Sequence, residues 1–82
     1  MHYPILFTED EGEIVVSSRH FPELITSGRS KQEALEMAED ALTVALLTYI
    51  EQGTPLPEPD APLPGEIQIH ATDEVEAVLG RR

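Results

Sequence analysis

The sequence has 82 residues, a formal net charge of −11 and no cysteine. This length predicts one small domain, and the lack of cysteine excludes a disulfide framework and a thiolate metal site. The surplus of acids disfavours phosphate backbones as ligands, so we expect no nucleic-acid binding by residues 1–82. No stretch reaches the ~18–20 apolar residues of a membrane span, and the chain becomes acidic at Glu9 instead of opening with a secretory leader. We therefore expect a cytoplasmic protein without membrane contact.

Three short segments in the first third of the chain have the composition of β-strands. Residues 3–8, YPILFT, alternate in the way of a partly covered strand, and residues 13–18, EIVVSS, are rich in β-branched side chains. Between them lies an acidic turn in which Gly12 can supply a positive φ. Residues 24–28, LITSG, predict a third strand, so we expect a three-stranded antiparallel meander.

A long helix between Ser30 and Gly53 has clear start and stop signals. Ser30 and Glu33 form a capping box, in which the hydroxyl accepts from the Glu33 N–H and the carboxylate accepts from the Ser30 N–H. Gly53 suits the first position after the helix, and Pro55 prevents continuation. One apolar stripe is expected to lie on the sheet, and it comprises Leu35, Ala38, Leu42, Ala45, Leu46 and Tyr49.

The second half of this helix carries more apolar residues than one sheet face requires. Thr43 is expected on the polar side of the helix together with the acids, but apolar residues share that side. Either the chain that follows covers them, or they contact another chain. For the second alternative, the candidate self-association residues are Val44, Leu47, Ile50, Ile67 and Ile69.

The segment after the helix, residues 54–65, is TPLPEPDAPLPG, and its prolines predict an extended strap. Because Leu56 and Leu63 are apolar, we expect the strap to lie against the domain.

An additional strand and a short helix are predicted at the C-terminal end. Residues 65–71 alternate, with Ile67 and Ile69 on one face, and should join a sheet edge in this chain or in a neighbouring subunit. Residues 72–82 predict a helical stub capped by Thr72. The fold class is therefore α+β: a three-stranded antiparallel sheet, one long helix packed across it and an additional C-terminal strand.

No pattern in the chain predicts catalysis. Phosphate-binding loops, nucleophile elbows and HExxH motifs are absent from the sequence. His2, His20 and His70 are scattered and are expected at the surface, so we expect no metal site, no cofactor and no enzymatic activity.

The densest charge feature is the predicted hairpin turn, which contains Glu9, Asp10 and Glu11. A solvated turn needs no function, so this cluster is compatible with solubility alone. The alternative is a docking patch that steers a basic protein toward the chain. In that case the loop around Phe21 and Glu23 would supply an anchor, because buried aromatic side chains carry much of the energy of an interface.

The order of these segments resembles the N-terminal domain of the HicB family of antitoxins. The resemblance covers residues 2 to about 70 and is carried by the following motifs: the Tyr3-Pro4 opening, the acidic turn before a Val-Ser strand, a Phe-Pro-Glu-Leu loop, Thr26-x-Gly28, Ser30-x-x-Glu33-Ala34-Leu35, and Gly53-x-Pro55-x-Pro57.

The resemblance implies a partial ribonuclease-H-like fold without nuclease activity. It also implies a partner, a HicA toxin, which is a small basic mRNA-cleaving protein with a catalytic histidine. Members of the family assemble as dimers or tetramers and usually repress their operon through a C-terminal DNA-binding module. On this basis residues 1–71 form the toxin-binding domain, which includes the strap, and residues 72–82 begin where such a module would start, so operator DNA would bind only through that module.

Two alternatives to a toxin-neutralising antitoxin remain open. A solo oligomeric domain of this family would have a structural or regulatory interaction role and no toxin. A residual nuclease would need converging carboxylates and a divalent metal.

Overall fold

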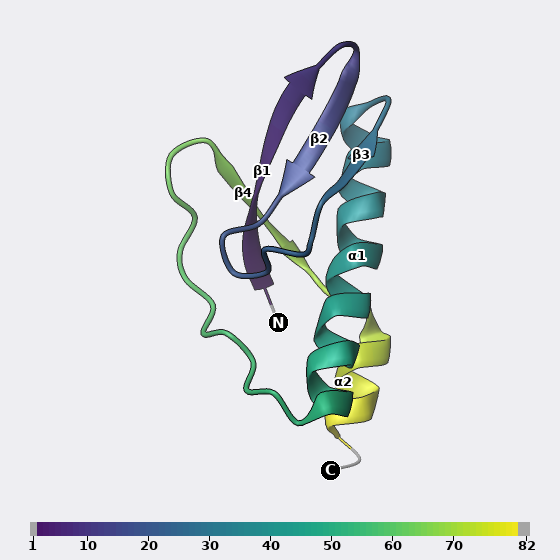
Figure 1. Cartoon of the computed structure of the whole chain (residues 1–82), viewed down its shortest axis with the longest axis vertical. Helices are drawn as coiled ribbons and strands as arrows, with labels where there is room; N and C mark the ends of the chain where they lie inside the picture. Colours follow the sequence, from purple (N-terminus) through teal and green to yellow (C-terminus); the bar gives the residue numbers. More distant parts are fainter. Residues whose placement is uncertain (1, 81–82) are drawn as a thin grey trace.

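The computed structural model describes residues 2–80, and Figure 1 shows one sheet beside one long helix. The α+β class is confirmed, with four strands in a single antiparallel sheet. The elements in chain order are β1 (His2–Asp10), β2 (Glu13–Ser17), β3 (Thr26–Gly28), α1 (Lys31–Gln52), β4 (Glu66–His70) and α2 (Asp73–Leu79).

The sheet has the strand order β3-β2-β1-β4, so the C-terminal strand joins the free edge of β1 in its own chain. The two partners of β1 take different halves of it. Residues 6–10 pair with β2, and residues 2–6 pair with β4. Pro4 lies opposite Gln68, in the half of β1 that pairs with β4 alone. Because proline has no N–H to donate, a position with one neighbouring strand suits it.

The start of α1 follows the predicted capping box with one difference. The Ser30 hydroxyl accepts from the Glu33 N–H at 3.1 Å, as expected. The Glu33 carboxylate, however, accepts from the Arg29 N–H at 3.1 Å instead of from the N–H of Ser30. At the other end Gly53 has φ 71°, and its N–H donates to the Ile50 carbonyl at 3.1 Å. A glycine tolerates this left-handed conformation, which ends the helix where the sequence predicts.

The backbones of helix α1 and strand β3 lie in close contact at Gly28. A Cβ on Gly28 would lie 2.4 Å from the backbone N of Ala34, so only glycine fits at this position. Ala34 and Ala38 are fully buried in this contact, and their small side chains permit it. The small residues of the helix therefore fix how α1 lies across the sheet, which decides where apolar surface is left uncovered.

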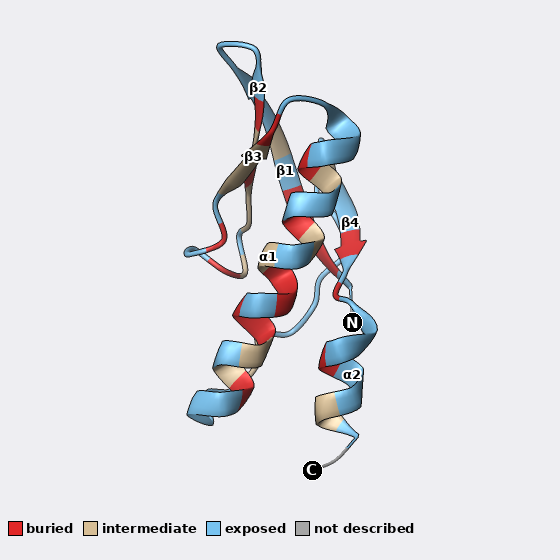
Figure 2. Cartoon of the chain, turned by 90° about the vertical axis from the view of Figure 1, so that its right-hand side faces the viewer, coloured by how far each residue is buried: buried red, intermediate tan, exposed pale blue. Residues whose placement is uncertain are grey.

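Helix α2 packs beside the C-terminal half of α1, as Figure 2 shows, and Val75 is fully buried there. The prediction that Thr43 lies on the polar side is wrong, because its side chain is buried at 6% exposure. Its hydroxyl donates to the Glu39 carbonyl at 2.9 Å, accepts from the Thr72 N–H at 3.0 Å and lies 3.2 Å from the Thr72 hydroxyl. The Thr72 side chain makes no cap hydrogen bond to α2, in contrast to the prediction. Thus the chain that follows covers part of the second half of α1.

Among the described residues, no helix has the combination of length and apolar character that a membrane crossing requires.

Candidate functional site

The β1–β2 turn places the predicted acids at one end of the molecule, which we call the hairpin tip (residues 9–13; Figure 1). The two turn residues, Glu11 and Gly12, have φ values of 51° and 84°. Two successive positive φ values are typical of a type I′ hairpin turn, which matches the twist of the flanking strands. The carboxylates of the tip are exposed, and within residues 2–80 no ion pair joins them to a base.

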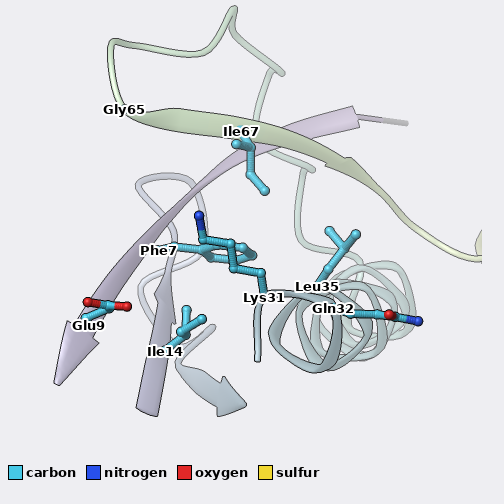
Figure 3. A pocket seen from close by; sticks show the side chains of 8 residues that line it. All are labelled: Phe7, Glu9, Ile14, Lys31, Gln32, Leu35, Gly65 and Ile67. Atoms are coloured by element: carbon cyan, nitrogen blue, oxygen red, sulfur yellow. The ribbon is translucent and has the colours of Figure 1, made fainter. Parts of the chain in front are cut away.

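An open apolar groove of about 750 Å³ lies beside the hairpin tip, between the sheet and the first turns of α1 (Figure 3). Its apolar walls come from four elements and consist of Phe7 on β1, Ile14 on β2, Ile67 on β4 and Leu35 on α1. Glu9, Lys31 and Gln32 also line it, together with Gly65.

Sequence reasoning did not identify this groove. Phe7 and Leu35 belong to apolar patterns that predict burial, yet both side chains are only half-buried, and Ile67 is 40% exposed. Alternation and helical spacing show which residues share a face, but they do not show where the covering helix ends.

The loop between β2 and β3 forms a closed aromatic cluster at the other end of the sheet. Phe21 is fully buried, with ring centroids 4.9 Å from Tyr3 and 5.3 Å from Tyr49 in edge-to-face geometry. The Ser18 hydroxyl accepts from the N–H groups of His20 and Phe21 at 3.1 and 3.0 Å, which folds the loop back onto the sheet. Phe21 is therefore unavailable as a surface anchor, because its ring completes the chain's own core.

Glu23 is exposed in the same loop, at the end of β2 opposite the hairpin tip. The structure therefore does not bring Glu23 together with Glu9, Asp10 and Glu11. Hydrogen bonding to the Glu23 carboxylate raises the pKa of the Tyr49 hydroxyl above its usual value. Glu23 accordingly has a local role beside the aromatic cluster.

The proline-rich strap is tied to this closed end of the molecule. The Tyr3 hydroxyl donates to the Pro57 carbonyl at 2.7 Å, and Leu56 packs against the core. Burial, and to a smaller extent the nearby Glu58, raises the pKa of Tyr3. The bond therefore holds the strap to β1 while the phenol stays protonated.

Charged groups fasten the far end of the strap. Arg19 donates to both carboxylate oxygens of Glu66 at 2.8 and 2.9 Å and lies 3.6 Å from Asp60. The hydrogen bonds from Arg19, followed by that from the Leu63 N–H, lower the pKa of Glu66 to about 2. The prediction that His20 lies at the surface is wrong, because its side chain is only 8% exposed. Its Nε2 lies 3.2 Å from a carboxylate oxygen of Asp60.

The five candidate self-association residues are separated by the fold. Ile50 and Ile69 are buried at 7% and 2% exposure, so neither offers surface to another chain. Ile69 pairs with Tyr3 in the sheet, and both Ile69 and Ile50 belong to the buried core cluster. Leu47 is half-buried, whereas Val44 and Ile67 are exposed at 64% and 40%. Self-association through these three stays a prediction.

Val44 also lines a second hollow, of about 320 Å³, together with Ile25 and Glu23. Ile25 is 70% exposed, because Leu24 beside it is the residue that turns into the core. Sequence reasoning placed both in a strand, whereas β3 begins only at Thr26.

Across residues 2–80, no three histidine, aspartate or glutamate side chains lie close enough together to hold a metal ion.

The fold is similar to solved antitoxin domains. A chain of the HicA3 and HicB3 toxin–antitoxin complex superposes with a TM-score of 0.67 at 22% identity, covering 83% of this chain and 92% of that one. The N-terminal domain of the Burkholderia pseudomallei antitoxin HicB gives a TM-score of 0.68 at 19% identity, with the same coverage. At these identities the likeness establishes the fold.

Sequence comparisons give nearer relatives. The Antitoxin HicB 2 of Photorhabdus laumondii is 33% identical over 79 residues, which are 96% of this chain and 57% of that protein. The Antitoxin HicB of Escherichia coli K12 is 42% identical over 62 residues, which are 72% of this chain and 45% of that protein. The chain thus spans about half the length of these relatives. The family described as the HicB-like antitoxin of bacterial toxin–antitoxin systems matches residues 2–75, and the chain belongs to this family.

Proposed function

We propose that the chain is the antitoxin of a bacterial toxin–antitoxin pair and neutralises a HicA-type mRNA interferase by binding over its catalytic surface. The observation that carries the proposal is family membership across residues 2–75. A HicB3 chain was solved in complex with a HicA3 toxin, which supports a partner of that kind. The mode of action is binding without catalysis.

The charge distribution supports a basic partner. The chain has a formal net charge of −11, and the acids of the hairpin tip are exposed without an ion pair inside residues 2–80. Such a surface accelerates encounter with a positively charged protein. The same charge repels DNA, so we assign no operator binding to residues 1–82.

Growth rescue tests the proposal. The small basic protein encoded beside the gene for this chain would be induced in a bacterial host, with and without the chain. We expect toxin alone to arrest growth, co-expression to restore it, and the two proteins to co-purify. The matched control is the toxin with its catalytic histidine replaced, which should bind the chain without arresting growth. Persistent arrest in the presence of abundant folded chain would contradict the proposal and favour a solo domain.

A further inference from the structure

We propose that the groove between the β1–β2 hairpin and the first turns of α1 is the docking site for a basic, amphipathic segment of the toxin. This assignment rests on the proposed function and names the surface that performs it. Three features of the groove carry the assignment: its uncovered apolar walls, its solvent-open shape and the sign of the charges around it.

On β1 and β4, the apolar side chains of the face toward α1 become more exposed toward the hairpin end of the sheet. On β1, Ile5 is fully buried, whereas Phe7, two residues further along the same face, is only half-buried. On β4, Ile69 is 2% exposed, and Ile67 on the same face is 40% exposed. Each strand therefore continues its apolar face past the point where the chain itself covers it. An apolar face that extends beyond its own cover is a surface suited to another chain.

The shape and lining of the groove favour a protein segment over a small polar ligand. Its volume of about 750 Å³ exceeds the 320 Å³ and 270 Å³ of two other hollows in the described part of the chain. In Figure 3 the apolar side chains of Phe7, Leu35 and Ile67 converge on the open space, while Gln32 points away from it. A small-molecule site has polar groups that converge on the ligand to orient it. Apolar side chains carried on a partner's helix or strand fit these walls better.

The charges at the mouth specify a basic occupant. Glu9 lines the groove, and the other acids of the hairpin tip follow it immediately. Lys31 is the one base among the lining residues, and in Figure 3 its side chain lies across the groove in front of Phe7. A segment whose lysines or arginines flank apolar anchors would place those anchors on the walls and its charges beside the tip. It would also have to move Lys31 aside.

Apolar and charged groups should then contribute to different rate constants. Desolvated apolar anchors slow dissociation, whereas exposed charges at a rim mainly accelerate association and do so less at high salt. This separation allows each half of the proposal to be tested with its own substitution.

The apolar half is tested with Ile67→Glu against the matched control Ile25→Glu. Both residues are exposed isoleucines, but Ile25 lies at the second hollow and not at the groove. Binding to the inactive toxin from the neighbouring gene would be measured by surface plasmon resonance. We expect Ile67→Glu to weaken affinity at least about tenfold through faster dissociation. Ile25→Glu should bind like the unmodified chain.

The charge half is tested with Glu9→Lys and Lys31→Glu. We expect Glu9→Lys to slow association several-fold at low salt, with the difference disappearing near molar salt, where screening extends only about 3 Å. Lys31→Glu should accelerate association, since it removes the positive charge that competes with the occupant. The opposite pair of effects would mean an acidic occupant and would overturn the proposal.

A mapping experiment on the unmodified chain guards against variants that fold poorly. In amide spectra of the isotope-labelled chain, saturating toxin should shift the signals of Phe7, Ile14, Leu35 and Ile67 more than that of Ile25. The circular dichroism melt of each variant shows whether it is folded.

The remaining outcomes separate the two proposals. If the unmodified chain binds the toxin but Ile67→Glu binds equally well and the shifts cluster elsewhere, the groove assignment fails and the antitoxin function stands. If Ile67→Glu converts an oligomer of the chain into a monomer without changing toxin affinity, a second copy occupies the groove and the assignment also fails. If the unmodified chain does not bind the toxin, the proposed function fails and the groove assignment falls with it.

Discussion

The two ends of the sheet differ in how far the chain covers their apolar residues. At one end the aromatic rings of Tyr3, Phe21 and Tyr49 pack edge to face, and the Tyr3 hydroxyl ties the strap to β1 by donating to the Pro57 carbonyl. At the other end Phe7 and Ile67 remain partly exposed beside an acidic turn. Figure 2 shows exposed residues at the hairpin and buried residues along the middle of α1.

From this difference we expect stability and recognition to depend on separate parts of this small domain. The closed end buries its apolar residues, so substitutions there should change the free energy of unfolding. The open end leaves apolar surface and unpaired carboxylates, so substitutions there should change binding. Substitutions at each end test this separation.

Removing the ring of Phe21 should break the closed end. Phe21→Ala leaves a cavity between Tyr3 and Tyr49 and should cost about 3–5 kcal/mol of unfolding free energy, a large share of what a small domain has. Urea denaturation followed by circular dichroism measures the loss. Ile25→Ala in the same loop removes an exposed side chain and should change stability by less than about 0.5 kcal/mol. A similar small effect of Phe21→Ala would show that the cluster is not a source of stability.

Widening the contact between α1 and β3 should affect both ends. Gly28→Ala places a Cβ 2.4 Å from the backbone N of Ala34, so the helix must move away, at a cost of about 1–3 kcal/mol. The shift should also alter the amide signals of Leu35 and Ile67 at the groove. Gly12→Ala is the control, since its Cβ would meet nothing within 4 Å and its cost comes from the φ of 84° alone. Unchanged groove signals in Gly28→Ala would contradict the view that this contact positions the helix.

Acid should loosen the strap through Glu66. Its pKa is lowered to about 2 in the folded chain from an ordinary value of 4.5, so the ion pair with Arg19 stabilises fully above about pH 4.5. That stabilisation is lost as the pH falls from about 4.5 to about 2. Glu66→Gln should therefore melt below the unmodified chain at pH 7, and the gap should narrow across this window. A gap that is independent of pH would show that the Arg19 pair contributes nothing.

The smallest effect is expected at the hairpin turn. Glu11 has a φ of 51°, which a glutamate adopts at some cost and an asparagine adopts readily. Glu11→Asn creates the Asn-Gly pair favoured in type I′ turns and should raise stability by about 1 kcal/mol or less. Glu58→Asn removes one exposed acid from the strap and serves as the charge control. Equal stabilisation by both would mean that lower charge repulsion, and not the turn, is responsible.

Features that depend on neighbours in sequence were predictable here. The Ser30 cap, the Gly53 stop and the three-strand meander follow from local spacing, and the structure confirms them. Failures occur where burial depends on a distant segment. Thr43 is buried because α2 returns beside it, and Phe21 because its loop folds back between Tyr3 and Tyr49.

The candidate site divides in the same way. The acids of the hairpin tip could be placed from sequence, because a turn between two alternating strands is a local feature. The groove could not, because its four apolar walls come from β1, β2, β4 and α1, and its opening depends on the crossing of α1 over the sheet. Even a local prediction can miss by one residue: the Glu33 carboxylate accepts from the Arg29 N–H and not from that of Ser30.

The split pairing of β1 has a consequence for the order of folding. Its β2 partner closes through a two-residue turn, whereas its β4 partner is reached only when His2 meets His70, which is 68 residues further along the chain. Loop-closure entropy and contact order both delay the second event. During synthesis the hairpin and α1 can form while β4 is still inside the ribosome. Because Ile67 is the wall supplied by β4, the groove is completed only after the hairpin and α1 have formed.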